Sequence, residues 1–563
     1  MNKIKELYIR FNNSKGKKIE IGVLIAYIVL KIIIISFHEP WFDENQAWLI
    51  AKSASLMDIL TKIPHDEGHP PLWHLIIMPF AKAGLPMELT LKLLVSVFTT
   101  ICIALILFKS PFKRIIRVAI PFTYFFFYQY GIISRCYCVM MLAFILCAIT
   151  YKDRDDKPFR FIGSLIILLL SSAYGLVLAA GICLVWLYDI WNKRNIFKFI
   201  KEFVRDKRCL ALVVITIVAL LAIVIIIPND NTYATNREPM NSLAQRIIYM
   251  LFIAPAEALC YDMQLNGIIL KLSDIYWGAL IAALPLCLMI DGILIMFMRK
   301  YKVLKEFLVP YIMLAIIGAQ LYFSLHHIGI ITLLILYVFW VGVDNNKPLE
   351  YNGDFINKFK INSKDKVKLH RLLIISIICA WIVSISFSVV ASINDIRDNY
   401  GGALEIAKFI KDNNLEDKKI ISSWNTIIDY ETDSEEDYMN IVSFADVVGY
   451  FEKNIIYNFN YGDKDALYIS HTTLTDKETQ EYFEYIASNG YPDVIIGEVK
   501  LNKIFGDDKN IPIYVPVKFI DSSIIWKYRK YYSRAYIYMR KDKLSEYKNI
   551  KQLKGIEPLQ VNN

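Results

Sequence analysis

Two adjacent carboxylates follow the first apolar segment of the chain. Asp43 and Glu44 stand within the sequence His38-Glu39-Pro40-Trp41-Phe42-Asp43-Glu44. A carboxylate near a membrane surface can act as a general base toward a hydroxyl group, with a second acid or a His to orient it. Acidic residues are common in the outer loops of membrane proteins, so an Asp-Glu pair by itself is a weak motif. The pair predicts catalysis only together with further motifs in a fixed order.

A second polar cluster follows in the same loop. His65, Asp66, Glu67 and His69 precede the Pro70-Pro71 pair that opens the next apolar stretch. Imidazole and carboxylate groups ligate divalent cations, but this cluster lacks the spacing of an established metal site. We assign these four residues to the substrate loop, and the sequence leaves open whether they bind a divalent cation.

Three further polar turns interrupt long apolar stretches. They are Ser134-Arg135-Cys136-Tyr137, Ser172-Ala173-Tyr174-Gly175 and Ser324-Leu325-His326-His327. An Arg or a pair of His residues at membrane depth is costly, and such residues usually face a polar cavity or a partner. The sequence therefore predicts that polar chemistry gathers where these turns meet.

Long apolar blocks provide the elements that must position these side chains. The chain has 563 residues, of which 55% are hydrophobic and 21% are charged, and the apolar residues are concentrated before residue 393. A membrane-spanning helix needs about 20 apolar residues. Five blocks fit one span each: Ile21–Phe37, Leu91–Phe108, Leu210–Ile227, Ile275–Phe297 and Leu372–Ala391.

Three other blocks, Val118–Tyr151, Phe159–Trp191 and Phe307–Val343, are too long for one span. Lys and Arg cluster at both ends of each block, and such clusters normally lie in the cytoplasm. Each block should therefore be a hairpin of two short helices with its polar turn outside. The pattern predicts an all-α polytopic membrane bundle of about eleven transmembrane helices, with a cytoplasmic N-terminus and an extracytoplasmic C-terminal end.

The predicted organisation has three parts: a basic cytoplasmic segment at residues 1–20, a multi-spanning domain at residues 21–392, and an extracytoplasmic soluble α/β domain at residues 393–563. In the last part we expect helices at Ala403–Asn413, Asp446–Lys453 and Lys477–Ser488. We expect strands at Lys419–Ser423, Ile455–Asn458, Leu467–His471, Val494–Glu498 and Ser533–Arg540. This alternation is typical of an α/β domain.

The formal net charge of +9 does not indicate a nucleic-acid partner. The basic residues lie in short loops between apolar blocks, which is an orientation signal for a membrane protein rather than a binding surface. We therefore expect contacts with membrane lipid and none with nucleic acid.

The combination of motifs resembles one enzyme superfamily. An Asp-Glu pair after the first span, followed by His-Pro-Pro (His69–Pro71) at the next membrane segment, is similar to the C-type glycosyltransferases, which take sugars from polyprenyl phosphates. The closest branch looks like the protein-mannosyltransferase and aminoarabinose-transferase group. The Ser134–Tyr137 turn matches a Ser-Arg-x-Tyr turn of that group. His326–Gly329 corresponds to its Arg-His-x-Gly element, with His326 in place of Arg.

The resemblance, which covers roughly residues 21–342, implies a membrane glycosyltransferase. The donor would be a polyprenyl-phosphate sugar, and the acceptor an envelope glycan, a lipid or a protein at the outer face of the cell membrane. Asp43 would be the catalytic base, and Glu44 would assist it. Some members of the superfamily bind a metal ion partly through an acidic residue in the second external loop. The corresponding turn here, Gln129–Tyr137, has no acidic residue. The sequence therefore identifies no certain cofactor and leaves a divalent cation open. The candidate ligands of the donor phosphate are Arg135, Tyr137, Arg237, Arg246, His326 and His327.

Two other functions fit parts of the pattern. A lipid or polysaccharide transporter without transferase chemistry would have carboxylates or broken helices at mid-membrane, often with an internal repeat. The span interiors carry little charge and no repeat is evident, which favours the enzyme. A surface-binding protein that uses its helices only as an anchor would need one span.

Overall fold

The computed structural model describes the chain except residues 1–10, 13–15, 192–201, 204, 229–241, 260–276, 322, 324, 346–362, 430–433, 460–466, 470–475, 507, 509, 527–528 and 560–563. The described part is mostly helical and forms two compact units. The first, which we call the helical unit, comprises residues 1–36, 93–224 and 238–393. The second, which we call the mixed unit, comprises residues 37–92, 225–237 and 394–563.

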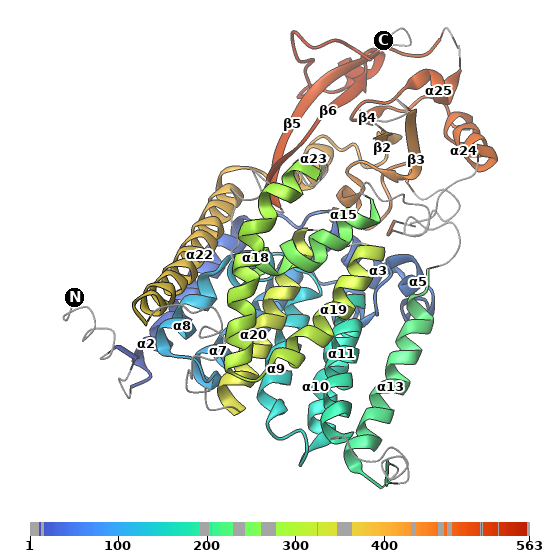
Figure 1. Ribbon diagram of the computed structural model, residues 1–563. Helices are drawn as coiled ribbons and strands as arrows, with labels where there is room; N and C mark the ends of the chain where they lie inside the picture. Colours follow the sequence, from blue (N-terminus) through green and yellow to red (C-terminus); the bar gives the residue numbers. More distant parts are fainter. Residues whose placement is uncertain are drawn as a thin grey trace. The chain divides into compact units, whose positions relative to one another are not determined.

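The helical unit is a bundle in which α9, α10, α11, α19 and α20 pack against one another (Figure 1). The main helices of the unit are α2 (Lys18–Phe37), α7 (Met87–Lys109), α8 (Arg114–Ala119), α9 (Tyr137–Tyr151), α10 (Pro158–Ser171), α11 (Ala173–Trp191), α13 (Lys207–Ile226), α15 (Leu243–Ile248), α16 (Ala254–Leu259), α18 (Trp277–Lys300), α19 (Leu304–Gln320), α20 (Ile328–Asn345) and α22 (Ser363–Arg397).

Six helices within the described residues are long and apolar enough to cross a membrane, and they indicate a membrane-embedded protein. They are α2, α7, α11, α13, α20 and the Ile378–Arg397 part of α22. Apolar side chains on their outer surfaces are exposed, for example Leu221 and Val224 of α13, each 63% accessible. Exposure of such apolar side chains to water is unfavourable, whereas contact with the hydrocarbon interior of a bilayer is not.

The helices break at the polar turns that the sequence predicts for two of the three long blocks. In the second block, α10 ends at Ser171 and α11 starts at Ala173. In the third, α19 ends at Gln320 and α20 starts at Ile328. The first block differs, because only its second half is a regular helix, α9.

Irregular backbone replaces the expected first helix of that block. Here α8 is followed by the 3₁₀ turn Ile120–Phe122 and the π-helix Phe125–Gln129. Pro121 lacks an N–H donor and disfavours a continuous α-helix at this point. In addition, a Cβ atom at Gly131 would lie 2.0 Å from the Phe127 carbonyl oxygen. The backbone therefore turns where an ordinary side chain would not fit.

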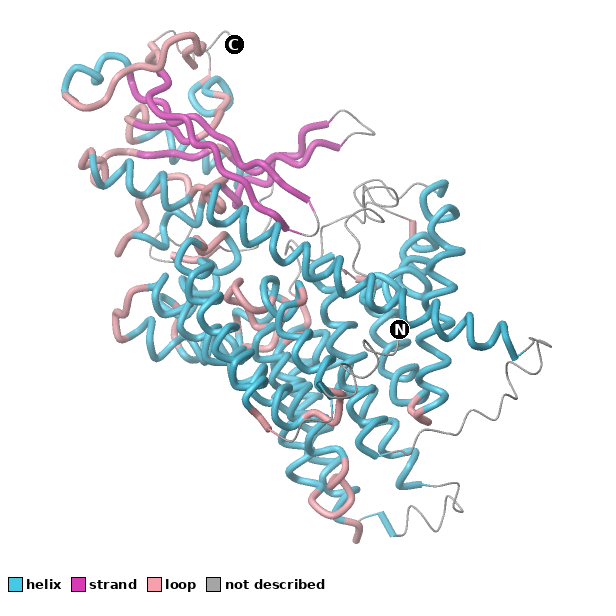
Figure 2. Tube along the Cα trace, turned by 90° about the vertical axis from the view of Figure 1, so that its left-hand side faces the viewer, coloured by secondary structure: helices cyan, strands magenta, loops and turns pink. Residues whose placement is uncertain are grey.

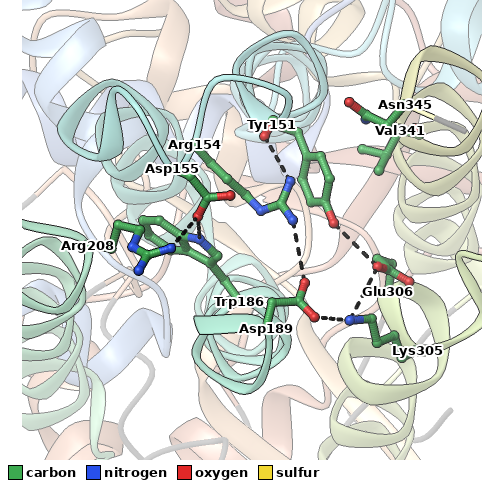
Figure 3. A network of polar contacts seen from close by, with 10 residues as sticks. All are labelled: Tyr151, Arg154, Asp155, Trp186, Asp189, Arg208, Lys305, Glu306, Val341 and Asn345. Carbon is green, nitrogen blue, oxygen red and sulfur yellow. Dashed lines mark hydrogen bonds and ion pairs between the residues drawn. The ribbon is translucent and has the colours of Figure 1, made fainter. Parts of the chain in front are cut away.

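A network of hydrogen bonds and ion pairs connects neighbouring helices at one end of the helical unit (Figure 3). Asp189, in the last turn of α11, accepts a hydrogen bond from Arg154, at 3.4 Å, and one from Lys305 of α19. The guanidinium of Arg154 also lies 3.8 Å from the ring centroid of Tyr151. Because Arg154 is in the turn between α9 and α10 and Lys305 is in the first turn of α19, Asp189 connects α11 to both segments at one end of the bundle.

Asp189→Asn is expected to lower the stability of the protein by about 1–2 kcal/mol, because Arg154 and Lys305 each lose a carboxylate partner in a partly buried site. The measurement is the Tm of the full chain in detergent. Asp156→Asn is the control, since Asp156 is exposed in the same region. Equal Tm values for the two variants would show that the Asp189 contacts do not stabilise the bundle.

The mixed unit contains the loop after α2, the tail of the chain and two sheets (Figure 2). Its helices are α3 (Phe42–Ser53), α4 (Leu56–Thr61), α5 (Ile63–Glu67), α6 (Leu72–Lys82), α23 (Ala403–Asp412), α24 (Asp476–Ser488) and α25 (Leu501–Phe505). Its strands are β1 (Ile420–Ser422), β2 (Trp424–Asp429), β3 (Ser434–Val442), β4 (Val494–Ile496), β5 (Tyr514–Trp526) and β6 (Arg529–Arg540).

The larger sheet has the strand order β1-β4-β6-β5, and β2 pairs with β3 in a separate ribbon. Strand β1 is parallel to β4, and the other pairs are antiparallel. Apolar side chains of α23, β1, β4, β5 and β6 form one core with Leu49 of α3. Burial of this shared core attaches α3 to the tail within the unit.

Most elements predicted in the tail are present. Helices α23 and α24 and strands β1, β4 and β6 occupy the expected segments. The expected helix at Asp446–Lys453 is a 3₁₀ turn at Ala445–Tyr450, and Ile456 makes only an isolated bridge to Ile420. Residues 467–469 are not in a strand, and His471 lies outside the described residues. The predictions of a strand at Ile455–Asn458 and of a helix at residues 446–453 were therefore wrong in detail.

Candidate active site

A buried ionic bridge fixes the start of α3 in the mixed unit. The His38 side chain contacts Glu44 Oε2 through Nε2 at 3.1 Å and Asp395 Oδ2 through Nδ1 at 3.0 Å. Glu44 is in the first turn of α3, and Asp395 is near the C-terminal end of α22. His38 and Glu44 are each 1% exposed. One imidazole thus connects two segments that are far apart in the sequence.

The two carboxylates keep His38 protonated. Burial alone would lower the pKa of the imidazole, but the negative charges of Glu44 and Asp395 and their hydrogen bonds outweigh burial and raise the pKa of His38 to about 10. At neutral pH both ring nitrogens therefore carry protons and donate to carboxylate oxygens.

Glu44 and its neighbour Asp43 have different environments. Besides the contact with His38, Glu44 Oε2 accepts a hydrogen bond from the Trp41 backbone N–H at 3.2 Å. Asp43 is partly exposed in the same helical turn. Asp43 lies in the first turn of α3, where the N-terminal end of the helix favours negatively charged side chains. Of the two predicted catalytic residues, Asp43 is the one that a substrate can reach.

The mixed unit also contains two buried carboxyl groups that the sequence did not identify as candidate site residues. Glu39 Oε2 is buried without a hydrogen-bond partner among the described residues, and Asp446 is 6% exposed. Burial raises the pKa of each to about 7; for Asp446 the charge of Glu39 adds to the effect, and for Glu39 the charges of Lys408 and His38 oppose it. Carboxyls that titrate near neutral pH are suited to proton transfer.

The substrate-loop residues lie at the end of α5 and just beyond it. Glu67 accepts a hydrogen bond at 3.0 Å from Gln46 of α3, and His65 Nδ1 lies 2.6 Å from the Ile227 carbonyl oxygen. Asp66 and His69 lie on either side of Glu67 and Gly68, the latter with a left-handed backbone (φ 65°). Within the described ranges, no three His, Cys, Asp or Glu side chains are grouped so that they could hold a metal ion.

The three polar turns meet at one end of the helical unit. The His327 ring lies 4.5 Å from Tyr174 and 6.1 Å from Tyr137, between ring centroids. The rings of His326 and His327 lie 3.8 Å apart, and the Tyr130 hydroxyl donates to the His326 carbonyl oxygen at 2.7 Å. The structure thus brings together Tyr137, His326 and His327, which the sequence assigned to one site.

Gly329 closes this cluster. A Cβ atom at Gly329 would lie 2.4 Å from a ring carbon of Phe125 and 2.6 Å from the Tyr130 hydroxyl oxygen. The absence of a side chain at Gly329 therefore allows the π-helix and the His turn to pack closely. This packing gives a physical reason for glycine in the His-His-x-Gly element.

The predicted arginines have different positions. Arg135 lies two residues before the start of α9 and is partly exposed. Arg246 of α15 donates to the Gln320 carbonyl oxygen at 3.2 Å, at the C-terminal end of α19, and its Nε is buried without a partner among the described residues. Gln320 is the last residue before the segment that leads to the His turn. Arg237 lies outside the described residues.

Comparison with known proteins gives no assignment: the chain matches no protein-family model, no curated protein and no solved structure.

The two units carry different kinds of chemical group. The mixed unit has an accessible carboxylate, Asp43, beside a charged bridge that holds its helix in place. The helical unit has aromatic and imidazole groups at one end, with two arginines on the adjoining segments. A carboxylate can accept a proton from a hydroxyl, and protonated imidazole and guanidinium groups bind phosphate oxygens.

Proposed function

We propose that the chain is a glycosyltransferase of the cell membrane that transfers a sugar from a polyprenyl-phosphate donor to an acceptor at the outer face. The acceptor is an envelope glycan, a lipid or a protein. The proposal includes a bundle of about eleven spans, a cytoplasmic N-terminus and an extracytoplasmic tail.

The observation that carries this proposal is the division of roles within the Asp-Glu pair. Glu44 is buried against His38 and the Trp41 N–H, whereas Asp43 is partly exposed. Such an arrangement is expected when one carboxylate positions the helix and the other reacts. A pair with only a surface role would not need a buried three-residue ion bridge beside it.

The proposed reaction needs one base and a binding site for phosphate. The acceptor hydroxyl oxygen forms a bond to the anomeric carbon while the bond from that carbon to the phosphate oxygen breaks. Asp43 accepts the hydroxyl proton, and the polyprenyl phosphate leaves with the bonding electron pair. Arg135, Arg246, His326 and His327 are the proposed partners of its negative charge. The donor already carries an activated sugar, so the reaction needs no nucleotide.

A transporter or flippase is the second candidate, because the helices contain more buried ionisable groups than the apolar pattern suggests. Lys31 of α2 is 1% exposed and donates to Thr99 and to the Val95 carbonyl oxygen at 3.2 Å. Asp291 of α18 also has a buried oxygen without a partner among the described residues. Ionisable residues inside membrane helices frequently mark transport pathways.

The test is a transfer assay in membranes that contain or lack the chain. A radiolabelled sugar is loaded onto the endogenous polyprenyl phosphate, and the label is followed into lipid, glycan and protein fractions. The proposal predicts that label leaves the lipid carrier and enters one acceptor fraction only when the chain is present. Movement of intact labelled lipid across the bilayer, without transfer of the sugar, would favour the flippase and contradict the enzyme.

A further inference from the structure

A cleft of about 670 Å³ opens in the mixed unit beside the start of α3. Its lining includes Trp41 and Phe42, and Phe519 and Tyr536 of the β5–β6 ribbon. Asp446, from the turn after β3, lines it as well. Ligand sites usually have volumes of roughly 300–1,000 Å³. The cleft is therefore large enough for a small ligand or for part of a polymer.

The backbone around the cleft is held in conformations that side chains rarely adopt. Phe444, which lines the cleft, has φ 57°, a left-handed conformation that is unfavourable for an aromatic residue. Gly497 has φ 78°, and a Cβ atom there would lie 2.3 Å from the Ser423 Oγ. Ser423 is held in turn by its carbonyl oxygen, which accepts from the Ser443 N–H at 2.6 Å. Strained positions of this kind cluster at ligand sites.

The charges that line the cleft do not favour an anionic ligand. Asp446 and Glu498 are acidic, and the cation, Arg534, pairs with Asp521 at 2.7 Å. A phosphate or an anionic lipid would meet two carboxylates and one cation that already has a partner. Neutral hydroxyl groups can instead donate to the carboxylates.

Aromatic rings complete the chemistry of the cleft. Four aromatic residues, Trp41, Phe444, Phe519 and Tyr536, line the cleft together with two acidic residues and two serines. A sugar ring has an apolar face of C–H groups and a rim of hydroxyls, so it matches both kinds of surface at once. A purely apolar ligand would cover part of the polar lining, which includes Asp446 and Glu498, without hydrogen bonding to it.

We propose that this cleft binds a neutral saccharide, and that this saccharide is the acceptor; the second part rests on the proposed transferase function. Phe42 lines the cleft and Asp43 is the next residue of the same helical turn. A saccharide in the cleft would thus lie beside the turn of α3 that carries the base.

The test measures binding to the full-length protein in detergent by titration calorimetry. The probe is the neutral oligosaccharide fraction released from the envelope glycans of the source cells, with the acidic fraction titrated separately. We expect the neutral fraction to bind the wild type and the Asp446→Asn variant to bind it at least tenfold more weakly. Absence of neutral binding, or binding of the acidic fraction alone, would overturn the proposal.

Phe444→Gly separates binding from folding. Glycine adopts the left-handed conformation without strain, so the folded chain should retain most of its stability although a ring is lost from the edge of the core. We expect at least tenfold weaker binding. Phe409→Ala is the control, because Phe409 packs against the same core and does not line the cleft. Equal binding by the two variants would refute the role of the Phe444 ring.

The binding and transfer experiments distinguish failure of the proposed saccharide cleft from failure of the proposed transferase function. If the wild type binds the saccharide and transfers no sugar, the cleft is a saccharide site and the transferase function is wrong. If the wild type transfers sugar and the two cleft variants show unchanged acceptor KM and unchanged binding, the cleft is not the acceptor site. If the two cleft variants show a tenfold rise in acceptor KM with unchanged donor KM, the result supports both the cleft as acceptor site and the transferase function.

Discussion

Asp43→Asn is expected to reduce sugar transfer by about 10²- to 10⁴-fold, the usual contribution of a positioned general base. The substituted amide keeps the shape of the side chain but cannot accept the hydroxyl proton. Because Asp43 is partly exposed, the Tm of the variant should stay close to that of the wild type. The measurement is the initial rate of transfer together with the Tm.

Glu44→Gln is the matched comparison, since it removes one negative charge from the adjacent position. This variant takes a charged partner away from His38 in a buried site, so its main effect should be a lower Tm. The transferase proposal requires the two substitutions to have different effects. Asp43→Asn should lower the transfer rate, and Glu44→Gln should lower the Tm. Full activity of Asp43→Asn would remove this carboxylate from the mechanism, and an equal loss of Tm in both variants would mean that Asp43 also has a structural role.

Local composition accounts for what the sequence predicted well. Continuous apolar runs predicted α2, α7 and α13, because the length and hydrophobicity of a helix in a membrane are set by the bilayer. The break between α10 and α11 was also predictable, because Ser172 and Gly175 interrupt an apolar run that is too long for one span.

The strands of the larger sheet were harder to predict from the sequence than the apolar helices. Strand β5 was not predicted, since a bulge between Pro516 and Lys518 disrupts the alternation of apolar and polar side chains on which strand prediction depends. The short β1 and β4 were found because each is a fully buried run of apolar or small residues. A run of that kind is visible in the sequence, whereas an irregular ladder is not.

The candidate site could be predicted only in part. Asp43, Glu44 and the His pair were found through the order of motifs along the chain. The bridge from His38 to Asp395 was missed, because the partners are 357 positions apart and no local pattern connects them. Asp446 was missed for a similar reason: its burial and its proximity to Glu39 depend on the fold of the tail. Tertiary contacts of this type leave no periodicity in a single sequence.

The His38 bridge predicts a pH dependence of stability with a definite sign. The folded-state pKa of His38 is raised to about 10, above its usual value of about 6.5. The folded state therefore binds a proton that the unfolded chain releases, so the stabilisation is complete below about pH 6.5 and is lost as the pH rises toward 10. Glu39 and Asp446, whose pKa values are raised to about 7, change charge at lower pH. Above pH 7.5 Lys419 also titrates, because burial lowers the pKa of its ammonium group to about 8, and its effect on stability has the opposite sign. The His38 contribution is therefore the difference in slope between the wild type and a variant that lacks the imidazole.

His38→Gln should lower the stability by about 3–5 kcal/mol at pH 7, because Glu44 and Asp395 then remain buried without a cation between them. The experiment follows the Tm of the full chain between pH 7.5 and 10, where we expect the wild-type Tm to fall relative to the Tm of the variant. His65→Gln is the control in the same loop, and it should keep the wild-type slope because His65 contacts a carbonyl oxygen rather than a carboxylate. A wild-type slope that persists in His38→Gln would assign the titration to another group.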